Sequence, residues 1–330
     1  MSKKGRRLVF GLLILGAGLA GGTYWVQSRL VAMPKGPAQY MRFETSSPIL
    51  VVLRDLQKAN IIRDSRVAGW YARFRREPTF VKEGTYRLSP GMEVREVLIA
   101  LRTPVRQMVR IPETNLSYRN ANILEKMNVC EAAEYRSFVA KPSEFAQVVG
   151  FALPRSGNLE GYLYPDTYDF PPLFGARNVI KRQLAAFERK AWPMLKETKD
   201  VNHVLTVASM VELEAGVDGD RPIIAGVIEN RLSKGMALQI DATLLYAISE
   251  WRRLTFKDYR TIKSPYSTYQ NKGLPPGPIC SPSIKSIEAA MKPTQHDFLY
   301  YVAKPDRTHL FAKTYAEHLA NIAKIRRGVS

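Results

Sequence analysis

A run of nineteen residues without a charged side chain, Leu8 to Val26, places the strongest constraint on how this chain folds. Nineteen helical residues at about 1.5 Å each nearly match the ~30 Å hydrocarbon core of a bilayer. Four Lys and Arg residues lie before the run and favour a cytoplasmic N-terminus, while Tyr24 and Trp25 suit the far interface. We therefore expect a cytoplasmic tail over 1–7, a single transmembrane helix over 8–26, and everything beyond it outside the cytoplasm.

The alternative for this segment is a signal peptide cleaved near Gly18-Leu19-Ala20, because small residues there follow a short apolar stretch. The net charge of the chain is +19, from 49 Lys and Arg against 30 Asp and Glu, and either topology limits the partners that this charge can attract. Such a charge attracts polyanions of several kinds. Outside the cytoplasm the expected ones are lipid headgroups and acidic wall polymers, and nucleic acid is not expected.

The length of 330 residues indicates two or three folded units. Pro and Gly without apolar periodicity mark 27–44 as a linker. We expect a small module over 45–104, a connecting subdomain over 105–152 and a larger domain over 153–330. Short strands mixed with helices throughout predict an α+β fold.

Hydrophobic periodicity places the elements within these units. Residues 84–88 alternate like a strand, Val105 to Ile111 reads as another, and Ser143 to Val149 reads as helical. A hairpin is expected over 298–312. In the larger domain, helices are expected over 176–191, 203–215, 222–233, 283–291 and 314–326.

The helix that follows Asn202 carries apolar residues almost all round, yet it contains Glu212 and Glu214. Two positions correspond to about 200° around a helix axis, so the two acids point to nearly opposite sides. The helix-surface neighbours of Glu212 are small, and this leaves space for a ligand to reach its carboxyl. A general acid is therefore one interpretation of Glu212. The other is that both acids meet basic partners such as Arg221 or Arg231.

Two polar loops could line a cleft beside this helix: 235–243, with Gln239 and Asp241, and 264–278, with Tyr266, Thr268 and Tyr269. Aromatic rings and amide or hydroxyl groups suit the binding of sugars. Rigid turns are the equal alternative, because both loops are rich in Gly and Pro.

The sequence contains no motif that is typical of a metal, nucleotide or serine-hydrolase site. The four His residues form no HExxH pair, and there is no GxSxG or P-loop motif, so we expect no metal and no cofactor. Cys130 and Cys280 show no CxxC spacing, and whether they form a disulfide stays open at this point.

Several long blocks of the sequence resemble the YceG-like or MltG-type endolytic murein transglycosylases, which are membrane-anchored enzymes of bacterial peptidoglycan synthesis. The resemblance extends over about 45–327. The matching blocks are EGYLYPDTYD (160–169), ASMVELEAGVDGDRPIIAGVIENRL (208–232), GMALQIDAT (235–243), SPYSTYQNKGLPPGPI (264–279), 298–303 and Glu317-His318.

The resemblance implies an activity and a site. It implies cleavage within glycan strands at the MurNAc-GlcNAc β-1,4 bond, with formation of a 1,6-anhydro-MurNAc end. It places the catalytic glutamate at Glu212 and a LysM-like glycan-binding module over 45–104. It also points to peptidoglycan strands as substrate and peptidoglycan synthases as partners. The chain departs from the family pattern at Ser267, Ser281 and Ser283, which leaves the shape of the sugar subsites open.

Two other functions fit the same residues. A hydrolytic muramidase would use Glu212 as the acid and Asp241 as its partner, at a carboxyl separation of ~5 to 9.5 Å. A non-catalytic wall-binding scaffold would use only the anchor and the LysM-like module to recruit wall synthases.

Overall fold

The protein is described here by a computed structural model that covers residues 3–114, 116–154 and 157–328, with side chains from Gly16 onward. Its contacts divide the chain into two compact units. The first comprises Met1–Gln107 with Pro171–Phe174, and the second comprises Met108–Phe170 with Gly175–Ser330. The predicted boundaries at 44, 104 and 152 stay predictions.

The first unit begins with a long helix, α1, over Lys3–Leu30. The part of the chain whose side chains are described contains no helix that is both long and apolar enough to cross a membrane. Residues 8–15 of the predicted span lie outside those described side chains.

Beyond α1, the first unit mixes short strands and helices. In chain order these are β1 (Gln39–Phe43), β2 (Ser47–Pro48), α2 (Ile49–Lys58), α3 (Ser65–Phe74), β3 (Phe80–Val81), β4 (Gly84–Leu88) and α4 (Val94–Ala100). Strand β1 pairs antiparallel with β4, and β2 with β3. The apolar faces of α2, α3, β4 and α4 form one core, in which Leu53, Leu56 and Val97 are fully buried.

The second unit holds most of the helices. Its elements are β5 (Met108–Ile111), α5 (Ser117–Lys126), α6 (Ala132–Val139), η1 (Pro142–Phe145), β6 (Asp166–Asp169), α7 (Ala176–Lys190), α8 (Trp192–Leu195), α9 (Val201–Glu214), η2 (Asp218–Asp220), α10 (Arg221–Ser233), α11 (Asp241–Ala247), α12 (Asp258–Thr261), α13 (Ile284–Met291), β7 (Tyr300–Ala303), β8 (His309–Ala312) and α14 (Tyr315–Arg326). Strand β5 pairs antiparallel with β6, and β7 with β8.

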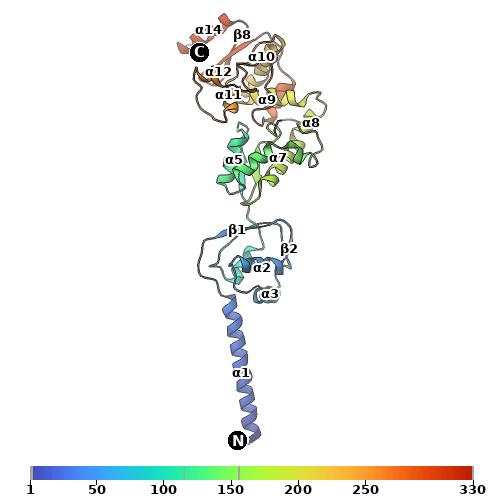
Figure 1. Cartoon of the computed structure of the whole chain (residues 1–330), viewed down its shortest axis with the longest axis vertical. Helices are drawn as coiled ribbons and strands as arrows, with labels where there is room; N and C mark the ends of the chain where they lie inside the picture. Colours follow the sequence, from blue (N-terminus) through green and yellow to red (C-terminus); the bar gives the residue numbers. More distant parts are fainter. Residues whose placement is uncertain (1–2, 115, 155–156, 329–330) are drawn as a thin grey trace. The chain divides into compact units, whose positions relative to one another are not determined.

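Helix α9 lies at the centre of the second unit. It packs against α10, α11 and α13, of which α10 and α11 are labelled near it in Figure 1, and every residue from Val204 to Glu212 is buried. Asp200 caps its first turn by accepting a hydrogen bond of 2.9 Å from the backbone N–H of His203. A helix covered on three sides explains why its sequence is apolar almost all round.

The mixed α+β architecture predicted from the sequence is confirmed. The strand at 84–88, the hairpin within 298–312 and the five helices of the larger domain are present, with ends shifted by one or two residues. Two predictions were wrong in extent. The strand expected over 105–111 begins only at Met108, and the helix expected over 143–149 is a short 3-10 turn that ends at Phe145. The two cysteines are free thiols.

Candidate functional site

The two acids near the end of α9 face different surroundings, as their spacing predicts. Glu212 is 5 % exposed, and Glu214 is half-buried at the last residue of the helix. Their hydroxyl partners come from distant parts of the sequence, whereas Arg221 lies close to Glu212 along the chain.

Glu212 is held by three groups. Ser283, the residue before α13, donates hydrogen bonds to Oε2 from its backbone N–H (2.9 Å) and its hydroxyl (2.5 Å). Oε1 lies 3.2 Å from Nη2 of Arg221, whose side chain is only 14 % exposed. Both carboxylate oxygens therefore have donors. The ion pair matches the interpretation in which an acid of this helix meets a basic partner.

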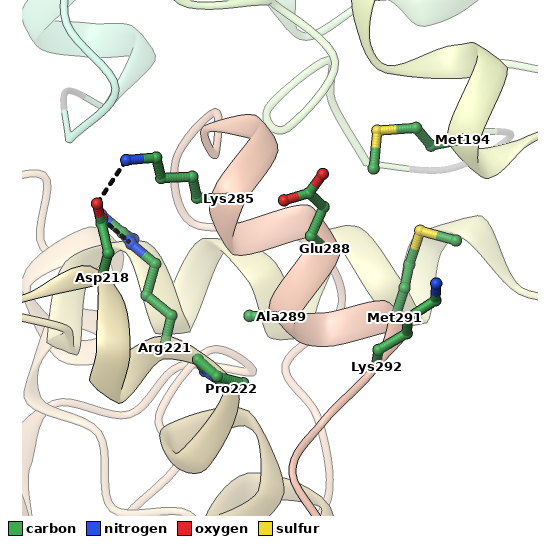
Figure 2. A pocket seen from close by; sticks show the side chains of 9 residues that line it. All are labelled: Met194, Asp218, Arg221, Pro222, Lys285, Glu288, Ala289, Met291 and Lys292. Atoms are coloured by element: carbon green, nitrogen blue, oxygen red, sulfur yellow. Dashed lines mark hydrogen bonds and ion pairs between the residues drawn. The ribbon is translucent and has the colours of Figure 1, made fainter.

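The guanidinium of Arg221 also lines a pocket of about 630 Å³ between α8, α10 and α13 (Figure 2). Nε of Arg221 donates to Asp218, and Nη1 donates to the buried Ser286 hydroxyl. Arg221 thus has a protein partner on each of its three nitrogens, and this arrangement fits a residue that organises the helix ends around Glu212.

Glu214 lies among hydroxyl and carboxyl groups on the other side of α9. The hydroxyl of Tyr301, in β7, donates a 2.9 Å hydrogen bond to Oε2 of Glu214. Burial raises the pKa of Glu214 to about 7, and the negative charge of Asp241 acts in the same direction. The Tyr301 bond and the Arg231 charge lower the pKa and only partly offset that rise. A carboxyl of this kind exchanges a proton readily near neutral pH.

Arg231 connects this region to the loop before α11. Its Nε donates to the carbonyl of Leu299 at 2.6 Å, and its Nη1 donates to the carbonyl of Leu238 at 2.7 Å. These bonds tie α10 to the start of β7 and to the 235–240 loop. Arg231 thereby fixes two of the segments that surround Glu214.

Asp241 begins α11 and accepts hydrogen bonds from two tyrosines. The hydroxyl of Tyr269 lies 2.5 Å from Oδ1 and that of Tyr259 3.3 Å from Oδ2, and the two rings are 4.7 Å apart between centroids. Burial raises the pKa of Tyr269, and the charges of Asp241 and Glu214 raise it further. The structure therefore brings Asp241, Tyr269 and Glu214 into one polar cluster.

The other residues predicted to bind substrate have different surroundings. Thr268 is buried, and its hydroxyl accepts from the backbone N–H of Ile240 at 2.9 Å, so it fixes the loop before Asp241. Gln239 is exposed, with a left-handed φ of 54°. Tyr266 packs against Tyr246, 4.7 Å between ring centroids. Whether any of them touches a sugar stays a prediction.

Sequence reasoning missed Tyr301, Tyr259 and Ser283 as partners of the acids. Each contacts its carboxyl from a residue far along the chain, and no local spacing reports such a contact. The one available signal was that Tyr301 lies within the block 298–303 quoted above, while Tyr259 and Ser283 lie shortly before and after the block 264–279.

Comparisons with known proteins agree on one family. The description "YceG-like family" matches residues 43–324. An endolytic murein transglycosylase of Bacillus subtilis is 31 % identical, over 83 % of this chain and 81 % of its own length. Its counterpart in Streptococcus pneumoniae is 29 % identical over 96 % of this chain, which spans 64 % of the length of that relative. A crystal structure of a YceG-like protein from Listeria monocytogenes is similar, with a TM-score of 0.58 and 30 % identity over 86 % of this chain and 98 % of that one.

Proposed function

The chain belongs to the YceG-like family, and we propose that it is an endolytic lytic transglycosylase of peptidoglycan. The relatives from Bacillus and Streptococcus are named for this activity. The observation that carries the proposal is the Glu214 carboxyl, which accepts a hydrogen bond from the Tyr301 hydroxyl and has a pKa raised by burial and by the charge of Asp241. Asp241 is itself held by the hydroxyls of Tyr269 and Tyr259.

The proposed reaction needs one group that gives and then takes a proton. Protonated Glu214 donates its proton to the O4 leaving oxygen as the bond from C1 of MurNAc to that oxygen breaks. The resulting carboxylate then takes the proton of the MurNAc 6-hydroxyl while O6 bonds to C1 and closes the 1,6-anhydro ring. Glu214 ends in its starting protonation state, and no water is consumed. A pKa near 7 suits both steps, because each form of Glu214 is well populated at neutral pH.

Positive charge develops at C1 of the sugar as the glycosidic bond breaks. The Asp241 carboxylate is held by Tyr269 and Tyr259 and is well suited to stabilise that charge without bonding to it. Tyr301 keeps the carboxyl of Glu214 in one orientation.

Glu212, the residue favoured by the sequence, remains the second candidate for the acid. Its carboxylate is engaged by Arg221 and by two donors of Ser283, and a proton transfer would have to disrupt these contacts. We therefore propose Glu214 for proton transfer and Glu212 for the support of α9, α10 and α13, and the contacts of Glu212 with Arg221 and Ser283 support this choice.

We also propose a location for the enzyme, at the cell membrane. We assign residues 8–26 to a single membrane anchor with the N-terminus in the cytoplasm, on the strength of the basic residues before the uncharged run. The LysM-like module over 45–104 would hold glycan strands close to the membrane. Peptidoglycan synthases are the expected protein partners.

Product analysis tests the activity. Detergent-solubilised full-length protein is incubated with purified glycan strands, and the new ends are analysed by mass spectrometry before and after borohydride treatment. The lytic reaction yields MurNAc ends one water lighter than reducing ends and resistant to borohydride. Reducible ends would indicate the hydrolytic muramidase, and binding without any new ends would indicate the scaffold.

A further inference from the structure

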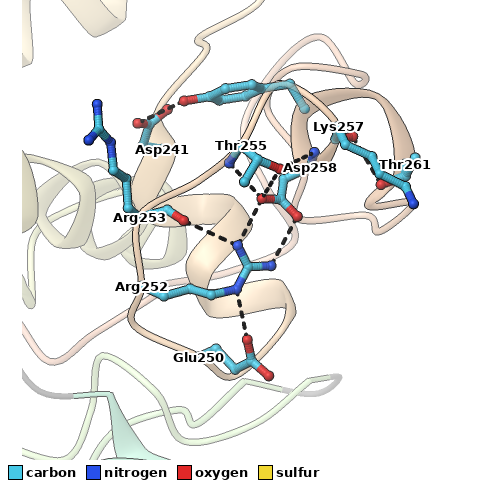
Figure 3. Close-up of polar contacts among 9 residues, drawn as sticks. Asp241, Glu250, Arg252, Arg253, Thr255, Lys257, Asp258 and Thr261 are labelled. Atoms are coloured by element: carbon cyan, nitrogen blue, oxygen red, sulfur yellow. Dashed lines mark hydrogen bonds and ion pairs between the residues drawn. The ribbon is translucent and has the colours of Figure 1, made fainter.

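The segment between α11 and α12 is an exposed loop held rigidly by an ion-pair network. Arg252 makes a two-pronged contact with Asp258, at 2.8 Å and 2.9 Å, and its Nε donates to Glu250 at 2.9 Å. Asp258 also accepts from the backbone N–H and the hydroxyl of Thr255. Figure 3 shows the contacts of Arg252 and Thr255 converging on Asp258, with Glu250 bonded to Arg252. Paired guanidinium-carboxylate bonds of this kind fix geometry as well as charge, so the loop is preorganised.

Two side chains on this loop, those of Arg253 and Phe256, do not contribute to the ion-pair network that holds it. The ring of Phe256 is 92 % exposed. Within the described residues, the guanidinium of Arg253 makes no hydrogen bond or ion pair. In Figure 3 this guanidinium points away from the Arg252–Asp258 network. A rigid loop with an exposed aromatic ring and an unpaired guanidinium is typical of a binding surface, since large exposed aromatic residues are enriched on such surfaces.

Both side chains line a cavity that borders the proposed catalytic cluster. This cavity has a volume of about 580 Å³, and its walls also include Asp241 and Tyr259. Asp241 is close enough to Glu214 for its charge to raise the pKa of that residue. The volume falls within the usual ~300 to 1,000 Å³ of small-molecule sites. A ligand in the cavity would therefore reach toward the reacting bond.

From this arrangement, which rests on the proposed function, we propose that Arg253 and Phe256, on the loop between α11 and α12, form a subsite for a carboxylate-bearing muramyl sugar. Arg253 binds the carboxylate, and Phe256 stacks on the apolar face of the sugar ring. A guanidinium matches a carboxylate in shape and charge through two parallel hydrogen bonds. GlcNAc has no carboxylate, so the subsite distinguishes the two sugars of the strand and sets the register of cleavage.

The carboxylate has two sources in peptidoglycan. In strands without peptides it is the lactyl carboxylate of MurNAc itself, whereas in peptide-bearing strands the lactyl group is an amide and the free carboxylates belong to the stem peptide. Peptide-free strands and peptide-bearing strands therefore form separate arms of the test. Peptide-free strands whose lactyl carboxylates have been reduced to alcohols supply the arm without a carboxylate.

The experiment measures binding of full-length protein to each kind of strand and kcat and KM for its cleavage. Arg253→Gln is compared with Lys257→Gln, because Lys257 is an exposed cation on the same loop that Figure 3 places on the side away from Arg253. We expect Arg253→Gln to weaken binding and raise KM about tenfold or more on carboxylate-bearing strands. The same variant should be unchanged on reduced strands, and Lys257→Gln should change less than twofold on all of them.

Controls separate this subsite from the fold and from the proposed activity. Arg253→Lys should restore part of the binding, and the melting temperature of Arg253→Gln should equal that of the wild type because the guanidinium has no described partner. Phe256→Ala should weaken binding of carboxylated and reduced strands alike. If strands bind through Arg253 but no anhydro ends form, the subsite stands and the transglycosylase proposal fails. Equal loss on carboxylated and reduced strands, or no loss on either, would overturn the subsite.

Discussion

The hydroxyl of Tyr301 donates a hydrogen bond of 2.9 Å to Oε2 of Glu214, and the two residues are 87 positions apart in the sequence. The bond connects the last residue of α9 with strand β7. It orients the carboxyl of Glu214, whose pKa burial raises to about 7, and it links that carboxyl to the hairpin at 300–312. The pair gives direct ways to test the proposed chemistry.

The first prediction distinguishes the two glutamates of α9. Glu214→Gln should lower kcat by about 10² to 10⁴, because the amide keeps the shape of the side chain but cannot transfer a proton. Glu212→Gln should lose less activity and show a lower melting temperature, because Arg221 then loses its buried carboxylate partner and keeps only Asp218. Kinetics on purified strands and thermal unfolding of both variants give the answer. An inactive Glu212→Gln of normal stability beside an active Glu214→Gln would restore the assignment made from the sequence.

The second prediction concerns pH. The raised pKa of Glu214 lies at about 7, and only the protonated form can act as the acid, so kcat should fall as the pH rises above about 7. The hydrogen bond from Tyr301 lowers the pKa of Glu214, so Tyr301→Phe should move this decline to higher pH. Tyr300→Phe is the matched control, since the described structure gives the Tyr300 hydroxyl no hydrogen bond. Identical pH profiles for the wild type and Tyr301→Phe would show that the fall of kcat at high pH does not come from Glu214.

The third prediction concerns the buried ion pair. Arg221→Met leaves the Glu212 carboxylate, 4 % exposed, without its cation, and should destabilise the fold by about 3 to 5 kcal/mol. Adding Glu212→Gln should recover a large part of that loss, because the unpaired charge is then gone. Lys285→Met removes an exposed partner of Asp218 in the pocket that Arg221 lines. It should lower the free energy of unfolding by at most about 1 kcal/mol. Urea unfolding measures all three, and a double variant no more stable than Arg221→Met would contradict the pairing.

The fourth prediction uses Glu160, which is 1 % exposed and accepts a hydrogen bond from the backbone N–H of Ser117 at 3.1 Å. Burial raises the pKa of Glu160 from 4.5 to about 7, so the folded state retains the proton more strongly than the unfolded state. The stability that this provides is complete below about pH 4.5 and is lost as the pH rises through about 7. At 1.36 kcal/mol per pH unit it amounts to about 3 kcal/mol.

Glu160→Gln should therefore flatten the dependence of the unfolding free energy on pH between 4.5 and 8, while its amide oxygen keeps the bond from Ser117. Glu197→Gln, at an exposed position, should leave the dependence as in the wild type. Urea unfolding at several pH values provides the measurement. A Glu160→Gln profile parallel to that of the wild type would show that this residue does not titrate in that range.

Much of the fold follows from local patterns. The apolar repeats of α9, α10 and α13 and the alternation in β4 are visible within segments of 5 to 14 residues, since helix and strand periods depend on neighbours along the chain. The segment Ser143 to Val149 shows the limit of such patterns. It follows Pro142 and remains a 3-10 turn, where the apolar spacing alone predicted a longer helix.

The sequence by itself determined the α+β character, the family, and the opposite orientations of Glu212 and Glu214 on one helix, because 100° per residue sets those orientations. The sequence offered Arg221 and Arg231 as basic partners, but only the tertiary structure decided which acid meets Arg221 and which hydroxyls bond each carboxyl. Ser283 reaches Glu212 across 71 positions and Tyr301 reaches Glu214 across 87. The hydrogen bonds that these distant segments make to the two carboxyls depend on tertiary packing, and local periodicity carries no information about them.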